Sequence, residues 1–350
     1  MELKDFIISF ASLMSVTGYE SYDADKLDSL IFDIFDESFT DAVGNRFFVK
    51  KCGRENAPRI LVDAHMDEIG MVVTDIKENG FLTVANIGGV DTRILQASDV
   101  IIYGKEKIFG VVGSTPPHLQ KPQDSKKLKE IGELLIDTGY SKEKLSELVR
   151  IGTPVGFAPK YSELANGKIS GKGFDDKACA ACAVEGIRRA AKEELAGDVY
   201  LMLSSREETG AVCGGAAPGS FSIDPDYALI IDVNLGRTPD TPKTETVIMG
   251  GGVSLTFCPV TDRALTKMTA ELADKNEIKW QISVSGRGTG TNTPAINLTR
   301  EGIPCVDVGL PLKSMHTSTE VLDMADAESA AELIKHFLCS KEIADAMRRA

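Results

Sequence analysis

Residues that can bind a metal ion or move a proton follow several short apolar runs of this chain. The runs end near residues 64, 203, 231 and 308, and the side chains that follow them are His65, Asp67, Glu207, Glu208, Asp232 and His316. A further acidic pair, Asp175-Asp176, precedes an Ala-rich run. In open α/β sheets, ligands bind beyond the carboxyl ends of the strands, so these side chains are expected to converge. Histidine nitrogens and carboxylate oxygens are the ligands of zinc-like ions, and the set therefore predicts a metal centre.

Taken singly, each of these residues also has an ordinary structural interpretation. Asp176 could cap the helix that follows it, His65 could be a buried histidine with satisfied nitrogens, and Asp232 could belong to a turn. Only the coincidence of the whole set at strand ends favours a site. The two remaining histidines lack this setting and are expected to be structural: His118 and His336.

The alternation of apolar runs and helical patterns is typical of an α/β protein. Strands are predicted over 59–64, 199–204, 227–233 and 303–308. Helices are predicted over 22–35, 178–192, 263–276, 293–301 and 325–337, and an amphipathic helical pattern opens the chain.

Between residues 71 and 165 the sequence pattern changes to short predicted strands separated by turn residues. These strands are predicted over 72–76, 81–84, 100–103 and 107–112. The pattern indicates a small β-rich module inserted into the α/β domain. We therefore expect an α/β/α domain with a mixed sheet, formed by residues 1–70 and 166–350, and an inserted, barrel-like domain at 71–165.

The composition of the chain indicates which partners it is not expected to bind and in which compartment it is expected. The 350 residues have a formal net charge of -13, which argues against nucleic acid or an anionic membrane as a partner. The Lys121–Lys129 run is interpreted as a solvated loop or helix face. No leader segment, run of about 18 apolar residues or disulfide framework is evident, so a cytoplasmic location is expected. Cys179 and Cys182 form a CxxC, but they are expected to be small buried helix residues.

The ordered motifs resemble those of one enzyme family. The motifs are Ala64–Gly70, Gly173–Lys177, Glu207–Gly210, Asp232–Val233 and Met315–Thr317, with Val112–Leu119 and Leu135–Gly139 in the inserted module. In this order they resemble the M42 metallo-aminopeptidases, cytosolic exopeptidases with two metal ions, related to the glutamyl and deblocking aminopeptidases. Some members have been labelled endoglucanases. The resemblance covers nearly the whole chain.

The resemblance implies a division of roles within the predicted site. His65 and Asp232 would hold one divalent ion, Glu208 and His316 the other, and Asp175 would bridge both. Zn²⁺ is the first expectation, with Co²⁺ or Mn²⁺ as alternatives. Three carboxylates against two divalent ions leave a local charge of about +1, which lowers the pKa of a bound water. Asp67 would orient the His65 ring by accepting its other N–H, and the Asp175-Asp176 peptide would be cis.

Glu207 and Glu208 are expected to have different roles although they are adjacent. Neighbouring side chains point in different directions, so both cannot easily bind one metal. The family pattern assigns Glu208 to the metal and leaves Glu207 as the general base that takes the water proton and returns it to the leaving amine. Two solvated surface acids are the alternative interpretation.

The resemblance implies an aminopeptidase that acts on peptides and self-associates, in some relatives into tetrahedral dodecamers, with the inserted domain serving dimerisation or assembly. A dinuclear amidase or deacylase of small N-acyl compounds is the main rival, and an inactive metal-binding scaffold is another. Endoglucanase activity is not expected because aromatic residues are only 6% of the chain. The chain departs from the family pattern at Lys177, at Asn234–Arg237 and at Asn292, which leaves the preferred N-terminal residue open.

Overall fold

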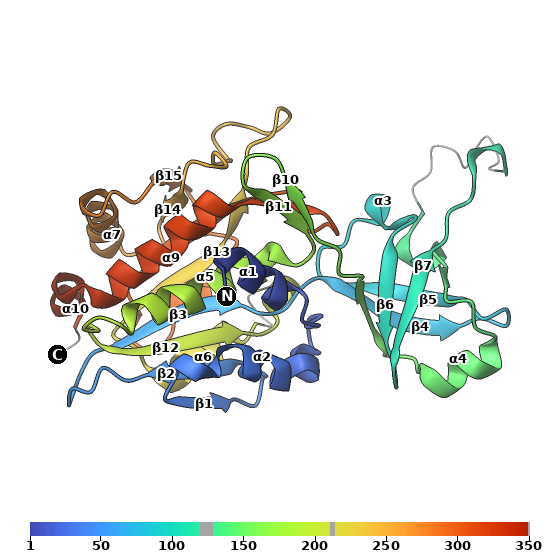
Figure 1. Cartoon of the computed structure of the whole chain (residues 1–350), viewed down its shortest axis with the longest axis horizontal. Coiled ribbons are helices and arrows are strands. Elements are labelled where there is room, and N and C mark those ends of the chain that lie inside the picture. The colour runs from blue at the N-terminus through green and yellow to red at the C-terminus, as the bar shows by residue number, and fades with distance from the viewer. Residues whose placement is uncertain (120–128, 211–213, 349–350) are drawn as a thin grey trace.

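The structure, a computed structural model, describes residues 1–119, 129–210 and 214–348. It consists of a large mixed sheet with helices on both faces and a separate closed barrel beside it (Figure 1). The expected α/β fold class with a small barrel is confirmed. The Lys121–Lys129 run lies almost entirely outside the described residues. In the part of the chain that is described, no helix is both long and apolar enough to cross a membrane.

The large sheet has the strand order β1-β2-β12-β3-β13-β16-β17-β11-β10, and β14 and β15 branch from β16. In this order the strands are β1 (Glu37–Thr40), β2 (Arg46–Lys50), β12 (Asp198–Ser204), β3 (Arg59–His65), β13 (Tyr227–Leu235), β16 (Cys305–Lys313), β17 (Glu320–Asp323), β11 (Lys168–Gly171), β10 (Ser162–Leu164), β14 (Val253–Phe257) and β15 (Trp280–Val284). The four central strands, β12, β3, β13 and β16, are mutually parallel. They are the four strands predicted from the apolar runs, and their carboxyl ends meet at one edge.

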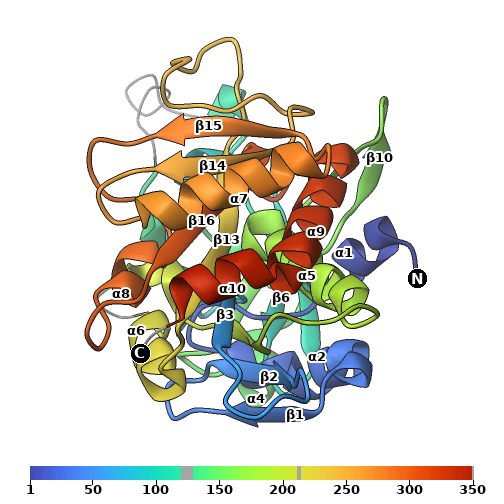
Figure 2. The same ribbon diagram turned by 90° about the vertical axis from the view of Figure 1, so that its left-hand side faces the viewer.

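Helices cover both faces of the sheet, which explains the continuous apolar runs of its central strands. Side chains of α1 (Leu3–Ala11), α2 (Ala24–Ile31), α5 (Phe174–Ala190), α7 (Arg263–Lys275), α9 (Met324–Cys339) and α10 (Lys341–Met347) share one core cluster. On the opposite face, α6 (Ala216–Ile223) and α8 (Thr293–Asn297) enclose a smaller cluster. Figure 2 shows α6 and α8 on one side of the central strands and α1, α5 and α9 on the other.

Two predicted helices are shorter than expected. The 22–35 pattern forms α2 flanked by two 3₁₀ turns, η1 (Glu20–Asp23) and η2 (Phe32–Ile34). The 293–301 pattern forms only α8, because Arg300 and Gly302 adopt positive φ and the Ile303 amide turns back to the Asn297 carbonyl. Helix α5 includes Asp175 and Asp176 in non-helical conformations, so its regular part begins near the predicted start.

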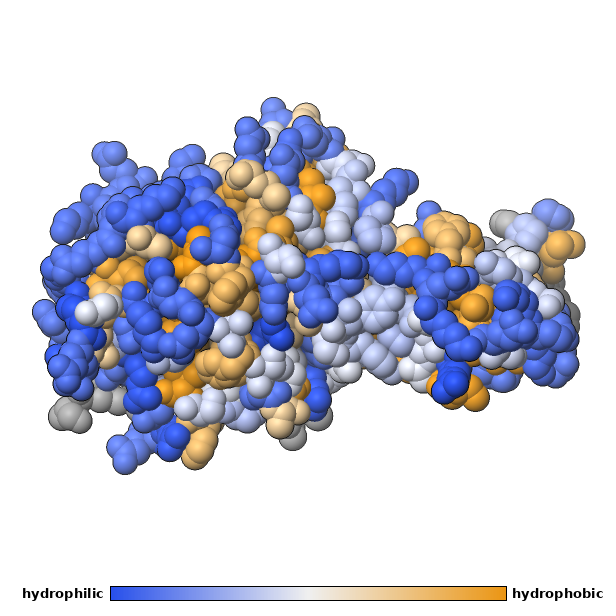
Figure 3. All heavy atoms as spheres, turned by 60° about the horizontal axis from the view of Figure 1, so that its bottom comes forward, coloured by the Kyte–Doolittle hydropathy of each residue, from blue (hydrophilic) through white to orange (hydrophobic). Residues whose placement is uncertain are grey.

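The barrel closes in the order β4-β5-β8-β7-β6-β9. Its strands are β4 (Gly70–Ile76), β5 (Leu82–Ile87), β8 (Ile136–Asp137), β7 (Lys107–Val112), β6 (Asp99–Tyr103) and β9 (Pro154–Phe157), and its short helices are α3 (Thr92–Leu95), α4 (Lys142–Leu148), η3 (Pro117–Leu119) and η4 (Ile131–Glu133). The barrel has its own apolar core. The following strand, β10, already belongs to the large sheet. Figure 3 shows a largely hydrophilic face with separate apolar patches over both parts.

Candidate metal centre

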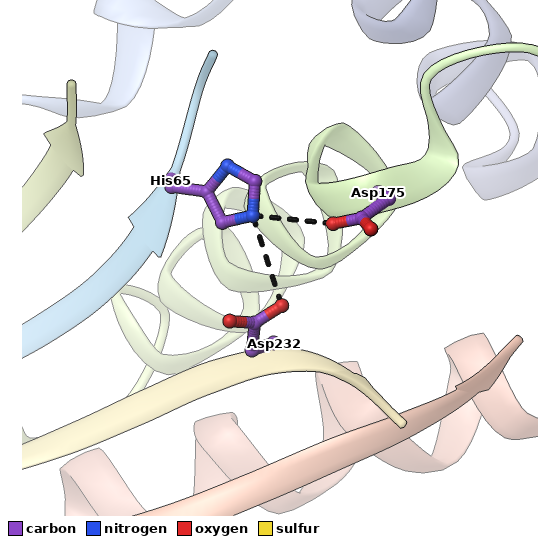
Figure 4. A group of neighbouring side chains, drawn as sticks. All are labelled: His65, Asp175 and Asp232. Atoms are coloured by element: carbon purple, nitrogen blue, oxygen red, sulfur yellow. Dashed lines mark hydrogen bonds and ion pairs between the residues drawn. The ribbon is translucent and has the colours of Figure 1, made fainter. Parts of the chain in front are cut away.

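The first group of candidate ligands lies at the carboxyl ends of two strands. His65 ends β3, Asp232 lies in the neighbouring strand β13, and Asp175 lies at the start of α5 (Figure 4). His65 Nε2 is 3.2 Å from Asp175 Oδ1 and 3.8 Å from Asp232 Oδ1. One ligand atom from each residue lies within 4.8 Å of the others, which is close enough to surround a single ion.

A second group shares Asp175 with the first. His316 Nε2 is 3.2 Å from Asp175 Oδ2 and 3.1 Å from Glu208 Oε2. Asp175 therefore directs one carboxylate oxygen toward each group. The barrel reaches this side of the site as well, because a Cβ on Gly89, in the loop after β5, would meet His316 Nδ1 at 2.7 Å. The Asp175-Asp176 peptide bond is cis, as the resemblance implied.

Glu207 and Glu208 form the start of a short 3₁₀ turn, η5 (Glu207–Thr209), just after β12. Their carboxylates point toward different groups. Glu207 Oε2 is 3.8 Å from His65 Nε2, whereas Glu208 Oε2 contacts His316. Both side chains line the same pocket, and neither is a solvated surface acid.

Asp67 supports the site differently from the sequence-based expectation. The His65 ring nitrogen Nδ1 is 3.0 Å from the Asp67 backbone carbonyl and 3.6 Å from the Asp67 carboxylate, so the carbonyl is the nearer acceptor. The carboxylate instead accepts the backbone amides of Glu207 and Glu208, at 3.0 and 3.2 Å, and the Thr17 hydroxyl. Asp67 thus orients the His65 ring through its main chain and the Glu207–Glu208 turn through its side chain.

Three further buried residues close to the candidate ligands in sequence or in space bind other buried groups. Asp176 accepts the backbone amide of His65 at the end of β3. Asn292, one of the departures from the family pattern, donates to the buried Asp63 carboxylate and to Ser204. Lys177, another departure, donates to the Leu13 carbonyl and lies 3.0 Å from Glu68.

Glu320 is a site residue that the sequence analysis missed. It is buried at the start of β17, and its carboxylate accepts backbone amides of Phe174 and Asp175 through Oε2 and of His316 through Oε1. One side chain therefore holds the backbones of two candidate ligands. Its position four residues after His316 was the available signal, but nothing in the sequence joined it to Asp175.

Replacing Glu320 by Ala is expected to weaken metal binding about 10- to 100-fold, the usual cost of losing a group that orients metal ligands. The reason is that three backbone amides lose their acceptor. Competition against a chromophoric chelator measures the affinity, with the exposed Glu301→Ala as the matched control. Unchanged affinity in Glu320→Ala would restrict Glu320 to a folding role.

The electrostatics of the site favour bound cations. Burial, with repulsion from Asp176, raises the pKa of Asp232 well above its usual range. Burial also raises the pKa of Glu208 to about 7, although the hydrogen bond from His316 opposes the shift. Glu208 Oε1 is buried and accepts no hydrogen bond from any described residue. Buried oxygen and nitrogen donors with an unpartnered carboxylate oxygen fit divalent metal ions, which stabilise clustered negative charge.

Both groups open into a pocket of about 990 Å³, a size typical of small-molecule sites. Its lining includes residues from the ends of β13 and β15 and from the 243–248 and 288–291 loops. Asn234, Leu235 and Arg237, which depart from the family pattern, are among them.

The residues interpreted as structural lie outside this pocket. Cys179 and Cys182 are buried on α5 within the larger core cluster. His336 lies on α9, 3.6 Å from Glu332, and His118 lies in the η3 turn of the barrel part. Neither histidine lines the pocket.

Parallel central strands that bring histidines and carboxylates together beside an open pocket are compatible with a metal-dependent hydrolase. Comparison with known proteins identifies the enzyme family within this class. The sequence matches the M42 glutamyl aminopeptidase family over residues 44–333, so the chain belongs to that family and is a peptide hydrolase.

Several relatives are similar along nearly their whole length. The lysyl aminopeptidase of Pyrococcus furiosus is 31% identical over 92% of this chain and 93% of its own. Aminopeptidase APDkam598 from Desulfurococcus kamchatkensis has a TM-score of 0.90 at 29% identity, covering 99% of this chain and 98% of its own. The TET1 peptidase of Pyrococcus horikoshii, which can assemble into a tetrahedron or a large octahedral shell, has a TM-score of 0.84 at 30% identity, covering 96% of this chain and 99% of its own.

Proposed function

We propose that this protein is an aminopeptidase with two metal ions per chain, which removes N-terminal residues from peptides. The observation that supports this most strongly is the position of Asp175, whose two carboxylate oxygens lie 3.2 Å from His65 Nε2 and 3.2 Å from His316 Nε2. One ion would be held by His65, Asp175 and Asp232, and the other by Asp175, Glu208 and His316. Each ion would then have three ligands from the protein and an open position, the arrangement of catalytic sites.

The ions would polarise the scissile carbonyl and make water acidic enough to attack near neutral pH. Zn²⁺ is the first candidate, with Co²⁺ or Mn²⁺ as alternatives, because the donors are nitrogen and oxygen only. The pocket leaves room for the N-terminal residue of a peptide beside the candidate ligands.

Glu207 is the proposed general base. It is not needed in either ligand group, and its carboxylate lies 3.8 Å from the metal-facing nitrogen of His65. In the forward step it accepts a proton from water as the water oxygen bonds to the peptide carbonyl carbon. It then donates that proton to the amide nitrogen as the carbon–nitrogen bond breaks. Asp67 fixes this geometry by binding the Glu207 backbone amide.

We also propose that the chain self-associates. The TET1 relative can assemble into a tetrahedron or a large octahedral shell. The barrel of this chain is separate from the large sheet, and we propose it as an assembly domain within residues 71–165. We also propose a cytoplasmic location, since free thiols such as those of Cys179, Cys182 and Cys258 are characteristic of a reducing compartment.

Two other hydrolytic activities use comparable residues. A dinuclear amidase or deacylase of N-acyl compounds would use the same ligand set. A glucanase would need aromatic platforms for sugar rings, and the described lining of the pocket contains no phenylalanine, tyrosine or tryptophan. The amidase is therefore the second candidate.

A pair of substrates that differ only at the N-terminus tests the proposal. The protein, loaded separately with Zn²⁺, Co²⁺ or Mn²⁺, is assayed on short peptides with a free amine and on the same peptides after N-acetylation. We expect hydrolysis of the free peptides only, one residue at a time from the N-terminus, as followed by mass spectrometry. Release of acetate, or cleavage of the blocked peptides alone, would support the deacylase instead.

A further inference from the structure

Asp307 lies on the pocket floor close to the candidate metal ligands. It is 3% exposed and lines the pocket. The parallel pairing of β13 with β16 sets Gly309 beside Asp232 and Asp307 beside Ile230, so Asp307 faces the same side of the sheet as Asp232. A strand spacing of about 4.8 Å and a rise of about 3.3 Å per residue place the Asp307 Cα about 8 Å from the Asp232 Cα. A long side chain can span this distance.

Only one of the two carboxylate oxygens of Asp307 accepts hydrogen bonds from described residues of the protein. Its Oδ2 accepts hydrogen bonds from the hydroxyls of Thr291 and Thr293, both at 2.7 Å. Its Oδ1 accepts none from any described residue. Because Asp307 lines the pocket and its Oδ1 has no partner among the described residues, this oxygen is available to accept a hydrogen bond from a ligand.

The residues beside Asp307 on the neighbouring strands are polar, so this part of the pocket floor is polar. The β14–β16 register extends to place Thr256 beside Asp307, and the β14–β15 register places Ser283 beside Thr256. All three residues line the pocket. Two residues earlier in β16, Cys305 is fully buried in the apolar core. The row Asp307-Thr256-Ser283 is thus the polar floor of the pocket, with one formal negative charge.

The basic residues of the pocket belong to a different part of it. Arg237 follows the end of β13, five residues past Asp232, whereas the floor row lies on the other side of Asp232 along the strand direction. Its guanidinium donates to the Lys243 and Thr246 carbonyls and to the Thr246 hydroxyl. Lys243 is exposed in the same loop as Glu245. The charge available at the floor is therefore that of Asp307.

We propose that Asp307 determines specificity by selecting peptides whose N-terminal residue is lysine or arginine. This inference rests on the proposed aminopeptidase function and names its substrate class. With the reacting amide at the metal centre, the cationic end of the side chain binds Asp307 Oδ1 through a charge-assisted hydrogen bond. An acidic side chain meets a like charge there, and an apolar one leaves the carboxylate unpaired.

The test compares p-nitroanilides of lysine, norleucine and glutamate, with norleucine as the neutral analogue of lysine. For the unmodified protein we expect kcat/KM for lysine to exceed that for norleucine at least tenfold, with glutamate the poorest. Asp307→Asn should reduce the lysine-to-norleucine ratio at least tenfold while leaving norleucine hydrolysis within about threefold. The exposed Asp240→Asn is the matched control and should leave the ratio unchanged.

Each contrary result overturns the inference for a distinct reason. Preference of the unmodified protein for norleucine or glutamate would refute it without any variant and would leave the aminopeptidase function standing. Equal losses on lysine and norleucine in Asp307→Asn would mean that the carboxylate only holds the Thr291–Thr293 segment. Absence of hydrolysis of every free aminoacyl substrate would remove the proposed function, and the inference with it.

Discussion

Replacing Glu207 by Gln is expected to lower kcat/KM on aminoacyl substrates by about 10²- to 10⁴-fold, the usual contribution of a general base. Glutamine keeps the size of the side chain but cannot accept the water proton. Metal content should stay at two ions per chain because Glu207 belongs to neither ligand group. Steady-state kinetics and elemental analysis of the same preparation measure both quantities.

The neighbouring variant Glu208→Gln is the matched control. It makes the same chemical change one residue away, in the same 3₁₀ turn. We expect it to lose the ion held with His316, because Glu208 Oε2 contacts His316 Nε2 and Oε1 is unpartnered. Metal loss in Glu207→Gln equal to that in Glu208→Gln would place Glu207 in the ligand shell and contradict its role as base.

Replacing Asp175 by Asn is expected to have the largest effect on metal binding, with loss of both ions and of all measurable activity. An amide has only one oxygen and no negative charge, so it cannot serve both groups as the carboxylate does. Loss of the charge also leaves the two ions facing each other with less compensation. Titration of the metal-free variant by calorimetry, for each ion separately, gives the number of sites.

The variant His316→Ala is the comparison for Asp175→Asn. It removes a ligand of one group only, so one ion per chain should remain with His65, Asp175 and Asp232. Full occupancy at both sites in Asp175→Asn, or loss of both ions in His316→Ala but not in Asp175→Asn, would refute a bridging role for Asp175.

Most of the candidate residues could be predicted because they follow or end a short apolar run, and parallel strands bring such ends to one edge. Asp175 instead precedes the Ala-rich run of α5, and its bridging role came from the family resemblance. The separate directions of Glu207 and Glu208 also followed from backbone geometry, and the structure shows Glu207 near His65 and Glu208 near His316. Their assignment as base and ligand came from the family resemblance and remains a prediction.

Other features could not be predicted because they depend on tertiary contacts between distant segments. Glu320 binds the backbone of Asp175, 145 residues away, and no local pattern encodes that contact. The choice between the Asp67 carbonyl and carboxylate as partner of His65 depends on loop conformation, which side-chain type does not determine. Helix α8 ended early because a left-handed turn at Arg300 and Gly302 overrode the helical pattern.

The pocket floor is a further feature that depends on tertiary contacts and could not be predicted. Asp307 lies in a predicted strand, but the sequence alone does not indicate that one of its carboxylate oxygens has no hydrogen-bond partner among the described residues. That property emerges from the register of β16 with β13 and from the Thr291 and Thr293 hydroxyls.

The central claim is that two ions held around Asp175 form one catalytic centre, and stepwise reconstitution tests it most directly. Metal-free protein is titrated with Zn²⁺, Co²⁺ or Mn²⁺ while the hydrolysis of a free aminoacyl substrate and the bound metal are measured together. We predict that full activity is reached only at the second equivalent per chain. Full activity at one equivalent, or no hydrolysis with two ions bound, would contradict the account.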